Sequence, residues 1–196
     1  MVHNLSFNLS DYRDVVVIDD ARYNLDSTDN TTSYDSIHHI TSRASTTYYA
    51  KRGVRLRSPD GTAVSRLFLF HGGGRLREAH VAVHSDRLYL AAGISLCCIE
   101  LQKLQIVWDA ELLRGADNGL YFPPHHDCIV AVGDFDVTSL SYGGSVLWHT
   151  NLHPWRTKLN GALATGAAID GDTITMRDGD GRHYTLSLST GMKIGG

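Results

Sequence analysis

The sequence lacks the features that mark secreted and membrane proteins. It has only 3 cysteines, Cys97, Cys98 and Cys128, and an odd number with two adjacent does not make a disulfide framework. The first residues carry neither the basic segment nor the apolar run of a signal peptide. The longest apolar run, residues 88–99, is too short to cross a bilayer. These absences predict a cytoplasmic protein with reduced cysteines and no membrane contact.

The sequence also lacks an excess of basic residues. Its 18 lysines and arginines and 21 aspartates and glutamates give a formal net charge of −3, whereas nucleic-acid-binding domains present a basic face. We therefore expect no nucleic-acid partner. One local basic strip is present, at Lys51, Arg52, Arg55 and Arg57. Because alternate residues of a strand share a face, the strip is predicted first as the solvent side of a hairpin and second as a ligand patch.

Motifs that would name a reaction are incomplete. Residues 71–74, His-Gly-Gly-Gly, resemble the oxyanion-hole loop of lipases and esterases, but no G-x-S-x-G nucleophile motif accompanies them. Residues 178–181, Asp-Gly-Asp-Gly, resemble part of a calcium loop, yet Ser187 stands where that loop needs a glutamate. The chain has no P-loop and no dinucleotide-binding glycine motif. We therefore predict no enzymatic activity and no cofactor.

Histidine is abundant, with 11 residues, so a metal site has to be considered. Several histidines come in pairs: His38 and His39, His80 and His84, His125 and His126, His149 and His153. A zinc site needs three or four converging ligands, and neither H-E-x-x-H nor C-x-x-C is present. No metal ligands are therefore predicted. A histidine-based metal-binding protein, or a hydrolase or nuclease with a histidine base, stays as the alternative.

No segment shows helical periodicity over three turns, which predicts an essentially all-β protein. The β-branched run 15–18 suits a buried strand. Residues 48–70 read as a hairpin, because the Ser-Pro-Asp-Gly sequence at 58–61 is a strong turn signal. Residues 19–47 are polar and predicted to be a long surface loop with a short strand near 37–41.

The rest of the chain repeats itself. Residues 86–108 and 127–148 align at an offset of forty, which matches Trp108 with Trp148. A weaker third copy, 172–195, has Gly195 where the tryptophan would stand. A period of about 40 to 50 residues with short strands is typical of a propeller blade. After the first copy, residues 109–114 are predicted to form one helical turn.

The pattern within each copy resembles the quinoprotein-like, or PQQ-repeat, propeller family. The matching residues are Gly93, 98–100 and 106–108 in the first copy, Gly133 and 145–148 in the second, and 189–193 in the third. The resemblance covers roughly residues 80–196. It implies that the repeat tryptophans are structural and pack between adjacent blades. Because complete propellers have about four to eight blades, this chain is too short for a seven- or eight-bladed ring, and the family's quinone site is not carried over.

We therefore predict a partial or small β-propeller-like array of three to four antiparallel blade-like sheets. Residues 1–79 are expected to form N-terminal strands, the polar loop and the hairpin. Residues 80–196 are expected to form repeats at about 80–120, 121–160 and 161–196, packed with the rest as one unit. An open array exposes sheet edges, which pair readily with other chains.

These edges predict a non-enzymatic protein-binding module, or a homo-oligomer formed through the same edges. An immunity protein that neutralises a cognate bacterial toxin is the more specific hypothesis. Acidic loop residues would face a basic toxin cleft, and aromatic residues would anchor the contact. The predicted protein-binding residues are Glu111, Asp117, Tyr121, Phe122, Asp134, Asp136, Tyr142 and Trp155. A core position for the four aromatic residues is the competing interpretation.

Overall fold

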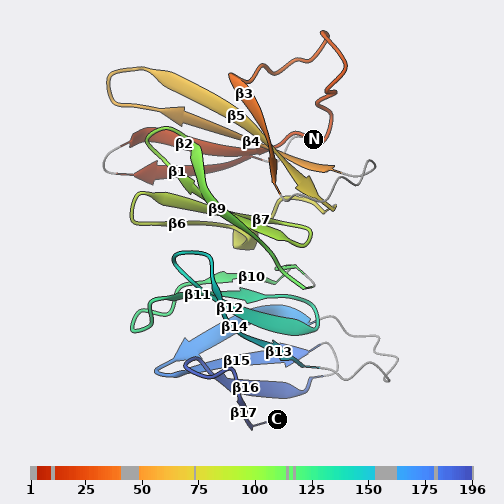
Figure 1. Cartoon of the computed structure of the whole chain (residues 1–196), viewed down its shortest axis with the longest axis vertical. Helices are drawn as coiled ribbons and strands as arrows, with labels where there is room; N and C mark the ends of the chain where they lie inside the picture. Colours follow the sequence, from red (N-terminus) through yellow and green to blue (C-terminus); the bar gives the residue numbers. More distant parts are fainter. Residues whose placement is uncertain are drawn as a thin grey trace.

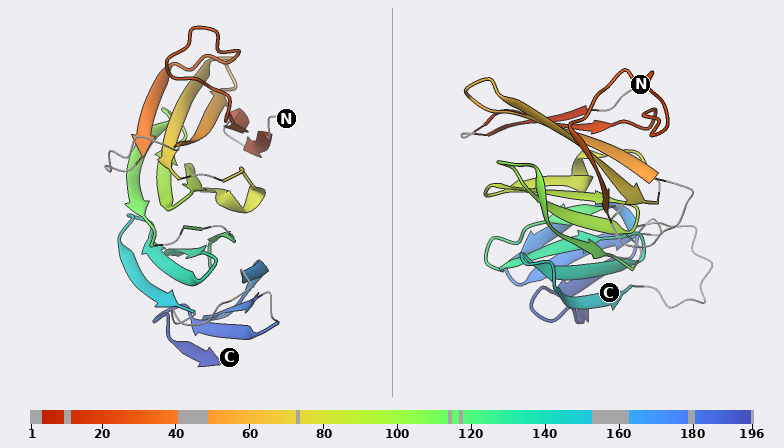
Figure 2. Two further views of the ribbon diagram at one scale, coloured as in Figure 1. Left: turned by 90° about the vertical axis from the view of Figure 1, so that its right-hand side faces the viewer. Right: turned by 45° about the horizontal axis from the view of Figure 1, so that its top comes forward.

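The chain forms four β-sheets stacked one after another along an arc (Figures 1 and 2). The N-terminal strands lie at one end of the long axis and the C-terminal strands at the other, so the sheets do not close a ring. This computed structural model describes residues 4–9, 12–40, 49–72, 74–113, 115–116, 118–152, 163–178 and 181–195. In those ranges the only helical segment is the short 3₁₀ turn η1 (Glu78–His80). The prediction of an all-β, blade-like array is confirmed.

The first sheet has an added strand at its edge. Its order is β1 (Asn4–Leu9), β2 (Tyr12–Asp19), β4 (Tyr49–Arg57), β5 (Ala63–His71) and β3 (Ser36–Ile40). The first four strands form an antiparallel meander. By contrast, β3 pairs with β5 in parallel. The polar segment between β2 and β4 thus returns a strand to this sheet, near where the sequence predicts one.

The other three sheets are four-stranded antiparallel meanders. The second contains β6 (Val81–His84), β7 (Arg87–Ala92), β8 (Ser95–Glu100) and β9 (Gln105–Glu111). The third contains β10 (Gly119–Tyr121), β11 (Cys128–Val132), β12 (Asp136–Ser141) and β13 (Val146–Asn151). The fourth contains β14 (Leu163–Asp170), β15 (Thr173–Asp178), β16 (His183–Ser187) and β17 (Lys193–Gly195).

The prediction of a helical turn at 109–114 is wrong for residues 109–111, which belong to β9. Asp109 and Glu111 pair with Cys97 and Ser95, so the segment extends β9 to the end of β8. Backbone pairing across the sheet therefore prevails over the local preference for a helical turn.

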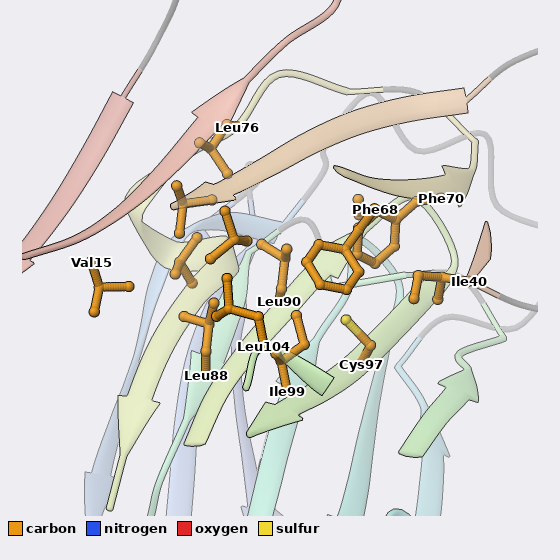
Figure 3. Close-up of a cluster of buried hydrophobic side chains, with 14 of the residues drawn as sticks. Val15, Ile40, Phe68, Phe70, Leu76, Leu88, Leu90, Cys97, Ile99 and Leu104 are labelled. Atoms are coloured by element: carbon orange, nitrogen blue, oxygen red, sulfur yellow. The ribbon is translucent and has the colours of Figure 1, made fainter. Parts of the chain in front are cut away.

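Each pair of neighbouring sheets encloses its own apolar core. The core between the first and second sheets contains Phe68, Phe70, Leu88 and Ile99 (Figure 3). The next two cores are built around Tyr89, Leu96 and Ile129, and around Val130, Ile174 and Leu186. Each sheet is therefore stabilised mainly by its sequence neighbours, as in repeat proteins.

The repeat tryptophans join consecutive sheets, as the family resemblance implies. Trp108 Nε1 donates to the carbonyl of Tyr142 at 2.8 Å, and Trp148 Nε1 donates to the carbonyl of Leu188 at 2.7 Å. Each indole lies on a turn glycine of the following sheet. A Cβ on Gly144 would lie 2.6 Å from Trp108, and one on Gly191 would lie 2.5 Å from Trp148.

The first sheet makes the corresponding contact with different residues. Arg66 on β5 donates from Nε to the carbonyl of Lys103, in the β8–β9 turn, at 3.1 Å. In that turn the residue with positive φ is Leu104 (φ 50°) rather than glycine, and its side chain is fully buried in the first core. An arginine–leucine pair therefore takes the place of the tryptophan–glycine pair.

The two faces at the ends of the array differ. On the far side of the fourth sheet, Thr175, Arg177, His183 and Thr185 give a polar surface, while Ile174 and Leu186 point into the third core. On the far side of the first sheet, the segment after β2 packs down through Tyr34. The Tyr34 ring lies on Gly53, where a Cβ would be 2.1 Å from its hydroxyl, and that hydroxyl donates to Asp20 at 2.8 Å.

Candidate interaction surface

The structure divides the predicted binding residues between the two ends of the sheets. In the second sheet, His84 pairs with Arg87 at the β6–β7 turn, whereas Glu111 pairs with Ser95 at the opposite, β7–β8 turn. We call these the His84 end and the Glu111 end. Phe122 and Tyr142 lie at the His84 end, because both rings stack with His84. One continuous site containing all the predicted residues is therefore not formed.

At the His84 end, the three rings lie nearly parallel to one another. The His84 ring is 5.3 Å from Phe122 and 5.1 Å from Tyr142, with interplanar angles of 18° and 11°. Phe122 and Tyr142 are half-buried and pack against the second core, while His84 is exposed. Burial raises the pKa of the Tyr142 hydroxyl, with Cys128 and Asp127 as smaller contributors. Both aromatic residues therefore contribute in part to the core, as the competing interpretation predicted.

At the Glu111 end, the three described acidic residues differ in exposure. Asp136 is 2% exposed, and its carboxylate lies 3.8 Å from His149 Nε2. Asp134 is half-buried and accepts a hydrogen bond from Asn118 Nδ2 at 3.2 Å. Glu111 is exposed. Of these three residues, Glu111 and Asp134 therefore offer carboxylate surface to a partner.

Tyr121 is the last of the predicted residues that the structure describes. The Tyr121 hydroxyl donates to the carbonyl of Asn118 at 3.2 Å and accepts from the Ala167 amide at 2.8 Å, which ties the third sheet to β14. Tyr121 is thus a structural contact between sheets. Asp117 and Trp155 lie outside the described residues.

A row of exposed apolar residues on the outer strands was not predicted from the sequence. In each repeat, the register of the last two strands shifts at a β-bulge. The shift lies between Trp108 and Ile106 in β9, between Trp148 and Val146 in β13, and between Gly195 and Lys193 in β17. The extra residue is apolar each time, and we call these three residues the bulge row: Val107 (45% exposed), Leu147 (55%) and Ile194 (61%).

The bulge row lies on strands that end their sheets. β9, β13 and β17 are the last strands in the order of the second, third and fourth sheets. Val146 and Met192, 54% and 68% exposed, extend the apolar surface on β13 and just before β17. The first sheet has no such bulge at Arg66, and β3 covers the edge of its β5 instead. In the sequence, the bulge row is marked by the apolar residue that comes directly before Trp108, Trp148 and Gly195.

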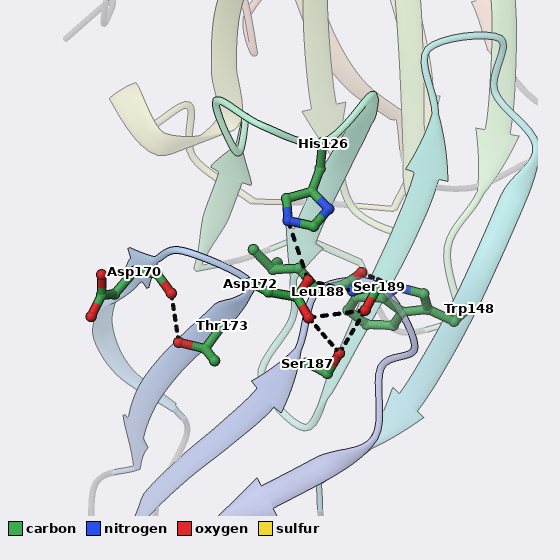
Figure 4. Close-up of polar contacts among 8 residues, drawn as sticks. All are labelled: His126, Trp148, Asp170, Asp172, Thr173, Ser187, Leu188 and Ser189. Atoms are coloured by element: carbon green, nitrogen blue, oxygen red, sulfur yellow. Dashed lines mark hydrogen bonds and ion pairs between the residues drawn. The ribbon is translucent and has the colours of Figure 1, made fainter.

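The ionisable groups near these surfaces are held by structural contacts. Asp172 accepts hydrogen bonds from the Ser189 amide and hydroxyl and from the Ser187 hydroxyl, and lies 3.3 Å from His126 Nε2 (Figure 4). This network joins the third and fourth sheets. Within the described ranges, no group of three or more His, Cys, Asp or Glu side chains is placed to hold a metal ion. No helix in these ranges is long and apolar enough to span a membrane.

The likeness to known proteins is one of fold. No protein-family model matches the chain, and no curated protein matches it in sequence. Among solved structures, a europium-containing methanol dehydrogenase is 16% identical over 63% of this chain, with a TM-score of 0.52. BamB from Moraxella catarrhalis is 17% identical over 63%, with a TM-score of 0.45. A quinohemoprotein alcohol dehydrogenase from Pseudomonas putida is 10% identical over 58%, with a TM-score of 0.48.

The chain spans only 25%, 36% and 19% of the length of these three proteins, in the same order. At such identities the likeness concerns architecture and no activity. It agrees with the repeat register, the tryptophan–glycine contacts and the meander topology described above. The chain thus has the fold of a partial propeller with PQQ-type blades.

Proposed function

We propose that this chain is a non-enzymatic protein-binding scaffold and that its docking surface is the bulge row. The observation that carries the proposal is the repeated β-bulge, which turns Val107, Leu147 and Ile194 outward on three consecutive edge strands. Bulges re-aim side chains and recur next to functional sites. Apolar residues exposed along unpaired sheet edges suit contact with another chain.

The pairing of β3 with β5 in the first sheet supports an extended segment as the partner. There β3 adds to β5 from Ser36 opposite Arg66 to Ile40 opposite Phe70. Its residues alternate, with Ile40 buried in the first core and Ile37 40% exposed. A partner's extended segment with alternating apolar residues would meet β9, β13 or β17 in a similar way, through main-chain hydrogen bonds and side-chain contacts.

The test compares lysine substitutions within and outside the bulge row. Leu147→Lys places a charge in the row, whereas Leu113→Lys changes an even more exposed leucine, 71% exposed, at the Glu111 end. Tagged proteins are incubated with lysate of the source cells, and bound proteins are quantified by mass spectrometry. A partner bound by the wild type and by Leu113→Lys, and reduced about tenfold or more by Leu147→Lys, is the expected result.

A partner that binds Leu147→Lys as well as the wild type would overturn the assignment of the bulge row. Sedimentation of the purified chain identifies the case in which the partner is a second copy. Unchanged circular dichroism of both variants confirms that the substitutions leave the fold intact.

Neutralisation of a basic toxin is the finer form of this proposal. Its support is the carboxylate surface of Glu111 and Asp134, together with the preference of basic clefts for acidic partners. In that case the double variant Glu111→Lys/Asp134→Lys loses the partner, and the loss depends on ionic strength. A partner that responds to Leu147→Lys alone would point to another protein class.

A further inference from the structure

The outer face of the first sheet, away from the bulge row, contains a feature that the proposed function does not use. A cavity of about 460 Å³ opens there. Its floor includes Val16 and Ile18 of β2, and its walls include Arg55 and Arg57 of β4, with Ser33 and Asp35 at the rim. A volume of this size lies in the range of small-molecule sites. The cavity is therefore large enough for a small organic molecule.

Arg55 and Arg57 differ in the charge of their cross-strand neighbours. Both are exposed on one face of β4, and neither forms an ion pair with a described residue. Across the sheet, Arg57 has Asp14 as its neighbour on β2. Arg55 instead lies between Val16 on β2 and Ser65 on β5, neither of which carries a charge. Arg55 therefore has no charged cross-strand neighbour, and the carboxylate of Asp35, which also lines the cavity, is bound to Ser65.

The rim of the cavity is held in place by hydrogen bonds. The Asp35 carboxylate accepts from the Ser65 amide at 2.6 Å and from its hydroxyl at 3.2 Å, and the Asp35 amide donates to the Ser65 carbonyl at 2.9 Å. Tyr34, next in the chain, is fixed on Gly53 and Asp20. The Asp35 carboxylate is thus already engaged, and the segment that it anchors forms a fixed wall.

We propose that this cavity binds a small organic carboxylate, with the carboxylate on Arg55 and Arg57 and the organic body on Val16 and Ile18. Arginine presents paired N–H donors that match a carboxylate, and the apolar floor lies beside them. Because Asp14 and Asp35 also line the cavity, their charges oppose those of the two arginines. This balance favours an anion of single charge over a phosphate ester of double charge.

The experiment titrates the isotope-labelled chain with benzoate, phenyl phosphate and acetate, and follows backbone amides and arginine Nε–H groups by NMR. Benzoate is expected to shift Val16, Arg55, Arg57 and Ser65 along a saturable curve. Arg55→Gln weakens that binding about tenfold or more, the loss expected for a charge-assisted hydrogen bond. The matched control is Arg77→Gln, because Arg77 is exposed and lies outside the cavity.

Each outcome decides the proposal. Tighter binding of benzoate than of acetate and phenyl phosphate supports both the apolar floor and the single charge. Tighter binding of phenyl phosphate overturns the carboxylate assignment, and equal binding of acetate overturns the role of Val16 and Ile18. Shifts that do not saturate by about 10 mM, or that survive Arg55→Gln, overturn the site itself. Leu147→Lys leaves benzoate binding unchanged, so this test is independent of the bulge row.

Discussion

At the scale of residues, the contact between neighbouring sheets depends on glycine, which has no side chain to occupy the place of a tryptophan ring. Gly144 and Gly191 have φ values of 88° and 70°, in the left-handed region that glycine adopts at little cost. They also leave the space that the rings of Trp108 and Trp148 occupy. Both demands fall on one position in each turn. Conformation and packing therefore select the same residue.

These two demands can be separated by comparing Gly144→Ala with Gly61→Ala. Gly61 has a similar φ of 91°, but a Cβ there would meet nothing within 4 Å. Gly61→Ala is expected to lower the free energy of unfolding by about 1 kcal/mol, the cost of the backbone conformation alone. Gly144→Ala adds a clash with Trp108 and should cost about 1–3 kcal/mol more. Urea denaturation followed by circular dichroism measures both, and equal losses would contradict a packing role for Trp108.

Residue exposure in the bulge row could not be read from the sequence. Ile106 and Val107 are neighbours of similar character, yet Ile106 packs against the first core and Val107 is 45% exposed. The difference arises from the bulge, which depends on how β8 and β9 pair and not on either residue alone. Likewise, nothing local distinguishes buried Asp136 from half-buried Asp134.

At the scale of elements, the segment between β2 and β3 is fixed to the first sheet by few contacts. Tyr34 packs on Gly53 and against Tyr23, whose ring is 5.3 Å away. Burial, and then the hydrogen bond to Asp20, raise the pKa of the Tyr34 hydroxyl, so it stays a protonated donor at neutral pH. Together with the Asp35–Ser65 hydrogen bonds, this anchor holds the wall of the cavity in place.

Gly53→Ala is expected to release this segment without unfolding the sheet. The added Cβ would lie 2.7 Å from two ring carbons of Tyr34, while the backbone of Gly53 itself accepts alanine. Amide hydrogen exchange at residues 20–36 should accelerate about tenfold or more, with little change in β7 and β8. Mass spectrometry of peptic peptides measures both regions. Unchanged exchange at 20–36 would mean that Tyr34 does not hold the segment.

Of the four sheets, the first was the hardest to recognise as a blade from the sequence. The repeats from residue 80 onward share tryptophan, glycine and spacing, because the same inter-sheet contact recurs. In the first sheet, Arg66 and Leu104 make that contact instead, and the insertion that holds β3 lengthens the spacing between β2 and β4. The hairpin of the first sheet was predictable from its turn sequence. The structural similarity of this sheet to the other three was not.

At the scale of the whole molecule, three separate cores connect four sheets, and each core contains one cysteine. Cys97, Cys98 and Cys128 lie in the first, second and third core, and none is more than 3% exposed. Burial raises the pKa of all three thiols. The native chain therefore keeps them protonated, and the unfolded chain loses these protons above the ordinary thiol pKa of about 8.5. Stability should accordingly fall as pH rises above that value.

Thiol labelling can report how independently the cores open. Because each sheet contacts mainly its neighbours, Cys128 should become reactive at a different urea concentration from Cys97. A thiol reagent added at intermediate urea concentrations, followed by mass spectrometry of the labelled peptides, measures each site. A single labelling rate for all three cysteines would show that the array unfolds as one unit.

The tryptophan contacts also give the array a direction. In each one the preceding sheet supplies the donor, and the following sheet supplies the carbonyl and the turn. In β17 the bulge is kept, but Gly195 stands opposite Thr185 where the donor would be. Among the described residues, β17 therefore offers no indole to a further sheet, such as the first sheet of another molecule. A head-to-tail junction between two copies of this chain would therefore need another contact in place of the indole, as Arg66 provides between the first and second sheets.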